Sequence, residues 1–280
     1  MAHAIITALA ALGATALPLP LAPPGVVLRY RARLGQTATY AMSLEVGGEQ
    51  VSLGERRPIN IRAELEVSEE VIAQERDGSF WLRLRGRVLR VRDPSGTFGR
   101  GQHGAWPEVK VHMSRRGEVL ETQAADTKGH VGPFGRAFCS TLTQVGGVIL
   151  PRGPIQVGES WEWEKEGASQ TNRLTGISGE AQPTAHVSSR GRRRITLEET
   201  SEALGLTTGL SGEESQRSEL DLLVSLGVVA RNRVEIRLQV EGETILALDR
   251  GPQSFPTRAD LRIVSDARLV RLNGESVNLR

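Results

Sequence analysis

The chain has 280 residues, of which 39% are hydrophobic and 24% charged, and this composition is typical of a folded globular protein. It excludes a disordered tail, a collagen and a polytopic membrane protein. The 35 basic and 33 acidic side chains nearly cancel to a net charge of +2, so we expect no strong attraction to nucleic acid. Only three of the basic side chains are lysines, and GC-rich codon usage explains this arginine excess.

Residues 1–22 resemble an export signal. No charged side chain precedes Arg29, and an apolar run extends over residues 4–17, shorter than the roughly 20 residues that a spanning helix needs. Cleavage after Ala16 or Ala22 would follow small residues, although the usual basic residues before the apolar run are missing. The sequence predicts a periplasmic or extracellular protein without a transmembrane span in its mature chain. An uncleaved anchor or a buried terminal helix is the alternative.

Period-two alternation dominates the chain after residue 26. Aliphatic side chains alternate with polar ones over residues 59–67 and 234–240, and shorter runs lie at 82–84, 109–113 and 220–224. Successive side chains of a strand face opposite sides, so each run predicts a strand with one apolar and one wet face. Such strands are typical of antiparallel sheets. The sequence therefore predicts a mainly β protein with one large, strongly curled antiparallel sheet, a half-barrel or open barrel.

Turn signals separate these strands, as hairpin connections require. The alternation changes phase between Leu84 and Val91, with Gly86 inside the run, which predicts a bulge or bend there. The predicted turns are Gly47-Gly48, Asp77-Gly78, Arg116-Gly117, Gly227 and Glu241-Gly242.

One segment has the period of a helix. Phe134, Phe138, Leu142 and Val145 fall on one helical face, so we predict a single helix over residues 133–145 that covers part of the sheet. Within it lies Cys139, the single cysteine of the chain, which excludes an intrachain disulfide and a multi-thiolate metal site.

A short motif occurs twice, 123 residues apart. Gly35 and Gly158 each follow an aliphatic residue and precede a polar residue, a hydroxyl residue and, five positions on, Tyr40 or Trp163. This pattern predicts a turn that leads into a strand anchored by its aromatic side chain. We interpret residues 23–280 as one β-rich domain built from two similar halves, about 26–130 and 150–250. Two separate β-domains are the alternative.

Three stretches resemble a family of exported bacterial proteins of unknown function. They are Leu28-Arg29-Tyr30 followed by LGQTATY, Leu150-Pro151 followed by residues 154–161, and the Arg-Gly-Glu-Val turn at 116–119. This family is similar to the lipoprotein-carrier superfamily, in which an incomplete, curled antiparallel barrel holds an apolar groove under a helical lid. The resemblance covers most of residues 26–250 and implies a fold and a compartment, not an activity. The single predicted helix departs from a lid of several helices.

No catalytic, metal or cofactor motif is present in the sequence, so we predict no catalytic residue, no metal and no cofactor. The short basic run at residues 190–194 has no interleaved aromatics and does not predict nucleic-acid binding. The candidates for lining a ligand groove are apolar residues of the predicted strands and helix. They are Leu82, Leu84, Phe134, Phe138, Trp161, Trp163, Ile236 and Leu238.

Two function classes follow from these observations. The first is an exported, non-catalytic protein that binds an apolar ligand, a lipid or a lipid-linked partner on a concave sheet face. The second is a structural or interaction protein of the cell envelope with a fully packed interior. They differ in whether the apolar rows of the strands are completely covered. A hydrolase is less favoured, since no nucleophile with its base is evident.

Overall fold

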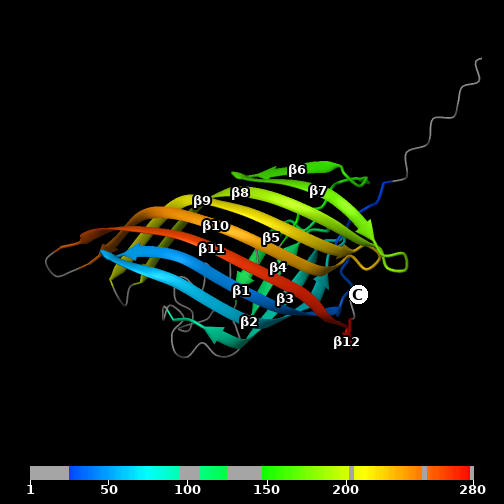
Figure 1. Cartoon of the computed structure of the whole chain (residues 1–280), viewed down its shortest axis with the longest axis horizontal. Coiled ribbons are helices and arrows are strands. Elements are labelled where there is room, and N and C mark those ends of the chain that lie inside the picture. Colours follow the sequence, from blue (N-terminus) through cyan, green and yellow to red (C-terminus); the bar gives the residue numbers. More distant parts are fainter. Residues whose placement is uncertain (1–24, 95–107, 125–146, 202–204, 248–250, 278–280) are drawn as a thin grey trace, which may run out of the picture.

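The computed structural model describes residues 25–94, 108–124, 147–201, 205–247 and 251–277. These residues form one antiparallel sheet of twelve strands, shown in Figure 1. The strands are β1 Thr37–Ser52, β2 Glu55–Gln74, β3 Phe80–Arg92, β4 Val109–Met113, β5 Val119–Ala124, β6 Ser160–Lys165, β7 Ala168–Ser178, β8 Thr184–Ser201, β9 Leu206–Leu223, β10 Val228–Leu246, β11 Gln253–Leu272 and β12 Glu275–Ser276.

The strand order is that of two meanders joined side by side. It runs β5-β4-β3-β2-β1-β11-β10-β9-β8-β7-β6, and β12 pairs only with β11. Strands of each half therefore pair with their neighbours in the chain, while β1 and β11 join the halves in a long register that places Val46 opposite Ile263. The sheet path has two ends, at β5 and β6.

One face of the sheet carries the core. The predicted alternation is confirmed in β2, where Ile59, Ile61, Ala63 and Leu65 are buried while the residues between them are exposed. In β10, Val234 and Ile236 are likewise buried, on either side of the half-buried Glu235. Apolar residues from this face form three clusters, which include members from strands as distant in the sheet as β3 and β8.

The opposite face of the sheet carries many of the arginines. Its side chains form ion pairs between strands, such as Arg262 with Glu235 at 2.8 Å on adjacent strands and Arg271 with Glu66 at 3.0 Å across β1. Exposed pairs of this kind each contribute little to stability. They do supply partners for a face that would otherwise consist of unpaired charges on long strands.

Two predicted turns are wrong. Gly47-Gly48 lies within β1 and Glu241-Gly242 within β10, whereas Asp77-Gly78, Arg116-Gly117 and Gly227 do connect strands. At Gly48, φ is +144° and a Cβ would collide with the carbonyl oxygen of Asp260 on β11. Gly48 and Gly242 permit close approach of neighbouring backbones inside the sheet. The sequence alone does not distinguish this role of a glycine from a turn.

The predicted change of phase in β3 is confirmed as a bulge. Val88 pairs with Leu65 and Arg90 with Glu64, so Leu89 is the extra residue and points outward, 53% exposed. Gly86 stays in register opposite Val67. The bulge returns Val91 to the core face after the parity of the sequence has changed.

The repeated motif forms the same turn twice. Gly35 N–H donates to Val71 O at 2.9 Å, and Gly158 N–H donates to Leu174 O at 2.7 Å. In return, Val71 N–H donates to Gln36 O and Leu174 N–H to Glu159 O. Both glycines have positive φ, +77° and +93°, and each turn leads into the first strand of a meander.

Substituting either turn glycine should therefore lower stability. A Cβ at Gly35 or Gly158 meets no atom within 4 Å, so the expected cost of valine, about 1 kcal/mol or more, comes from the backbone conformation alone. Gly153 is an appropriate control because it also has free space and its φ is not positive. Thermal unfolding of the three variants tests this. Equal melting of Gly35→Val, Gly158→Val and Gly153→Val would show that the conformation is not costly.

The mainly β, antiparallel character of the fold is confirmed, but the predicted helix and strong curl are not. The described residues contain no helix, and residues 133–145 lie outside them. The expected signal segment 1–22 also lies outside the described residues.

Candidate functional site

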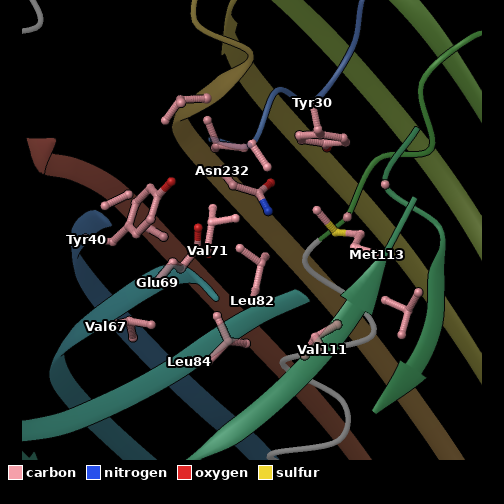
Figure 2. Close-up of a pocket in the computed structure, with 18 of the residues that line it drawn as sticks. Tyr30, Tyr40, Val67, Glu69, Val71, Leu82, Leu84, Val111, Met113 and Asn232 are labelled. Carbon is pink, nitrogen blue, oxygen red and sulfur yellow. The ribbon is translucent and has the colours of Figure 1, made fainter. Parts of the chain in front are cut away.

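A cavity of about 260 Å³ lies where the three apolar clusters meet. Residues from β1–β5, β10 and β11 and from the segment before β1 surround it. Figure 2 shows its walls of aliphatic side chains, with a few polar groups among them. The lining includes Tyr30, Tyr40, Met42, Val67, Glu69, Val71, Phe80, Leu82, Leu84, Val109, Val111, Met113, Asn232, Val234 and Ile236.

Two crossing segments seal one end of the core beside this cavity. Residues 25–36 and 147–157 are joined by backbone hydrogen bonds in both directions between Val26 and Ile155. The Arg29 guanidinium donates to the carbonyl oxygen of Pro151 at 2.6 Å. Leu28 and Leu150 are completely buried below these contacts. The segments therefore cover the core face where the sheet alone would leave it open.

Glu69 is the only acidic residue among the described residues that line the cavity. It belongs to the inward row of β2, between Val67 and Val71, where it is half-buried and faces the hollow. Burial raises the pKa of Glu69 to about 7 because it penalises the charged carboxylate, and a hydrogen bond from the Tyr40 hydroxyl offsets only part of this. The group can therefore change its charge near neutral pH.

Two tyrosines line the cavity with this carboxylate, and the Tyr40 hydroxyl is hydrogen-bonded to it. Tyr30 donates to Val148 O at 3.1 Å, which ties the first crossing segment to the second. Tyr40, the aromatic of the first repeated motif, lies beside Glu69 in Figure 2. Burial raises the pKa of both phenols well above their usual value, and the negative charge of Glu69 raises them further. Both hydroxyls therefore remain protonated, that of Tyr30 donating to Val148 O and that of Tyr40 to Glu69.

The predicted lining residues separate into groups. Leu82, Leu84 and Ile236 line the cavity together. Leu238, on the same row of β10, instead packs against the apolar cluster around Leu44 and Ile61. Phe134 and Phe138 lie outside the described residues.

The two tryptophans of β6 have structural contacts outside the cavity lining. The indole of Trp161 donates to Ile149 O at 2.6 Å, and that of Trp163 donates to Glu118 at 2.9 Å. Both therefore attach edge strand β6 to neighbouring segments, and the second contact links it to the turn before the other edge strand, β5.

Sequence reasoning missed Glu69, Tyr30 and Asn232 as lining residues. A signal for Glu69 was present: the inward row from Ile59 to Val67 continues with the same parity through Glu69 to Val71. A carboxylate in an apolar row is the type of exception that marks a site. Asn232 follows the same rule in β10, two positions before Val234.

A hydrogen-bonded Ser–His–Asp series lies on the outward face. Ser178 Oγ is 2.7 Å from His186 Nε2, and His186 Nδ1 is 2.7 Å from Asp221 Oδ1. The atoms are those of a nucleophile relay. However, the His and Asp side chains are 38% and 33% exposed, and the three residues do not line the cavity. We interpret them as part of a polar row that continues across β10 and β11 with the Arg231–Asp266 pair.

Within the described residues, no group of three or more His, Cys, Asp or Glu side chains could hold a metal ion. Of the histidines, His112 instead stacks on Trp81, with ring centroids 4.8 Å apart, and contacts Ser79 Oγ at 2.9 Å. No helix in the described part of the chain is long and apolar enough to cross a membrane.

Comparison with known proteins identifies no family. No family model and no curated protein matches the chain. Among solved structures, the chain is similar to the solid-state NMR structure of the outer membrane protein AlkL in DMPC lipid bilayers. The identity is 11%, the match covers 89% of this chain and 95% of the other, and the TM-score of 0.24 is too low to carry an argument.

Proposed function

We propose that this chain is an exported, non-catalytic binding protein that holds a small apolar ligand, or one acyl chain of a larger one, against the inner face of its sheet. The observation that carries the proposal is the cavity between the three apolar clusters, with Leu82, Leu84 and Ile236 in its wall. Its volume of about 260 Å³ is just below the roughly 300–1,000 Å³ of pockets for drug-sized ligands.

The polar groups support binding more than catalysis. An apolar pocket with a few convergent polar groups is the usual form of a small-molecule site. Glu69 is hydrogen-bonded to Tyr40 and shares the cavity with Tyr30, but none of the three is a nucleophile next to a base. The Ser178 series is open to water, where it lacks the desolvated and preorganised surroundings that activate a serine. The resemblance of residues 1–22 to an export signal and that of the chain to lipoprotein carriers favour a periplasmic or extracellular carrier.

A cavity-filling variant tests the proposal. We expect the wild type to bind a neutral dye that fluoresces in apolar surroundings, with a defined stoichiometry, and Val67→Trp to lose that binding because the indole occupies the cavity. Ser68→Trp is the matched control, since the next residue of a strand points to the opposite face. Circular dichroism checks that the variants keep their β-structure. Absence of binding by the folded wild type would favour the structural role in the envelope.

A further inference from the structure

Glu69 differs from the other carboxylates of its strand. Its neighbour Glu70 points outward and pairs with Arg83 at 3.0 Å, and Glu64 and Glu66 also have arginine partners. Glu69 forms no ion pair with any side chain of the described residues. The outward carboxylates Glu64, Glu66 and Glu70 of β2 are thus paired with arginines, whereas the inward carboxylate of Glu69 faces an apolar cavity.

A buried carboxylate without a cation is energetically unfavourable. The neighbours of Glu69 in the inward row are Val67 and Val71. An apolar residue at this position would therefore match the row and would avoid the cost of burying a charge. Burial and the Tyr40 hydrogen bond leave the carboxylate able to ionise near neutral pH. A cationic group that enters the cavity would supply the missing charge and form a charge-assisted hydrogen bond.

The distribution of charge around the hollow favours a cationic over an anionic ligand. Besides Glu69, the titratable side chains that line the cavity are Tyr30 and Tyr40, both protonated, and the two arginines Arg31 and Arg85. Both arginines are exposed, and Arg85 is already paired with Glu108 at 3.0 Å. An anionic head at Glu69 would meet a like charge, whereas an ammonium would meet an opposite one.

We propose that the cavity binds an amphiphilic amine, with its ammonium on the Glu69 carboxylate beside Tyr40 and its apolar chain along Val71, Leu82 and Val111. This inference rests on the proposed function and adds the chemistry of the ligand to it. In Figure 2, these side chains converge from neighbouring strands on the same hollow.

The test compares three probes of equal chain length with the full chain at pH 8: octylamine, 1-octanol and octanoate. By calorimetric titration, we expect octylamine to bind at least about tenfold more tightly than octanol, and octanoate more weakly than both. Glu69→Gln should abolish the preference for the amine while keeping octanol affinity. Glu64→Gln, the same change on the outward face of β2, should retain the preference.

The outcomes separate this inference from the proposed function. Equal affinity of the wild type for amine and alcohol, tighter binding of octanoate, or an amine preference that survives Glu69→Gln would overturn the amine assignment and leave an apolar site. Binding of none of the probes would overturn both. A lower amine preference at pH 5.5 than at pH 8 is also expected, because Glu69 is then protonated while the amine stays charged.

Discussion

Glu69→Gln should stabilise the protein at pH 8 and remove part of its pH dependence. The pKa of Glu69 is about 7 in the folded state, against an ordinary value of 4.5, so the folded state retains a proton that the unfolded chain releases between these values. The free energy of unfolding must therefore fall as pH rises from about 4.5 to 7, and it stays low above that. The loss can reach about 3 kcal/mol, since each pKa unit corresponds to roughly 1.4 kcal/mol. Glutamine has a similar shape and no charge, so the variant avoids this loss.

Urea unfolding of wild type and variant at pH 5 and pH 8 measures this effect. The difference between the two proteins should be large at pH 8 and small at pH 5, which cancels the contributions of other titrating groups. Glu64→Gln should show no comparable difference, because Glu64 is on the exposed face. Parallel pH profiles for wild type and Glu69→Gln would show that the carboxyl is not desolvated in the folded state.

Leu28→Ala should destabilise the protein by about 2–5 kcal/mol. Leu28 is 0% exposed and packs in the cluster that contains Leu150 and Leu174, beneath the two crossing segments. Its truncation removes apolar contacts and leaves a void that the hydrogen-bonded segments cannot easily close. The segments should then detach more readily from the end of the sheet.

Leu34→Ala is the control within the same segment. Leu34 is 69% exposed, so its truncation should change stability by no more than about 0.5 kcal/mol. The two variants are compared by their midpoints of urea unfolding, with the slope of the unfolding free energy against urea concentration unchanged. If Leu28→Ala lost as little stability as Leu34→Ala, residues 25–36 would not be a structural part of the core.

Local patterns in the sequence determined the strands and their faces. The alternation in β2 and β10 depends only on which side chains avoid water, so it could be read without knowing what each strand pairs with. The same is true of the turn glycines Gly35 and Gly158, whose positive φ is a local property. The sequence also placed Glu69 on the inward face of β2. Only the strands that lie opposite determine that this carboxylate lines a cavity.

Tertiary structure alone decided which strands meet and where space remains. The pairing of β1 with β11 joins residues more than 200 positions apart, and strands with the same alternation offer no local signal that selects one partner. For the same reason, the sequence predicted a turn at Gly48. What requires a glycine there is the close approach of the β11 backbone, which is distant in the sequence. Leu82 and Leu238 likewise belong to similar apolar rows, yet Leu82 lines the cavity whereas Leu238 packs, partly buried, against an apolar cluster. A sequence pattern places a side chain on a face, but the strands that lie opposite determine whether that face is filled or hollow.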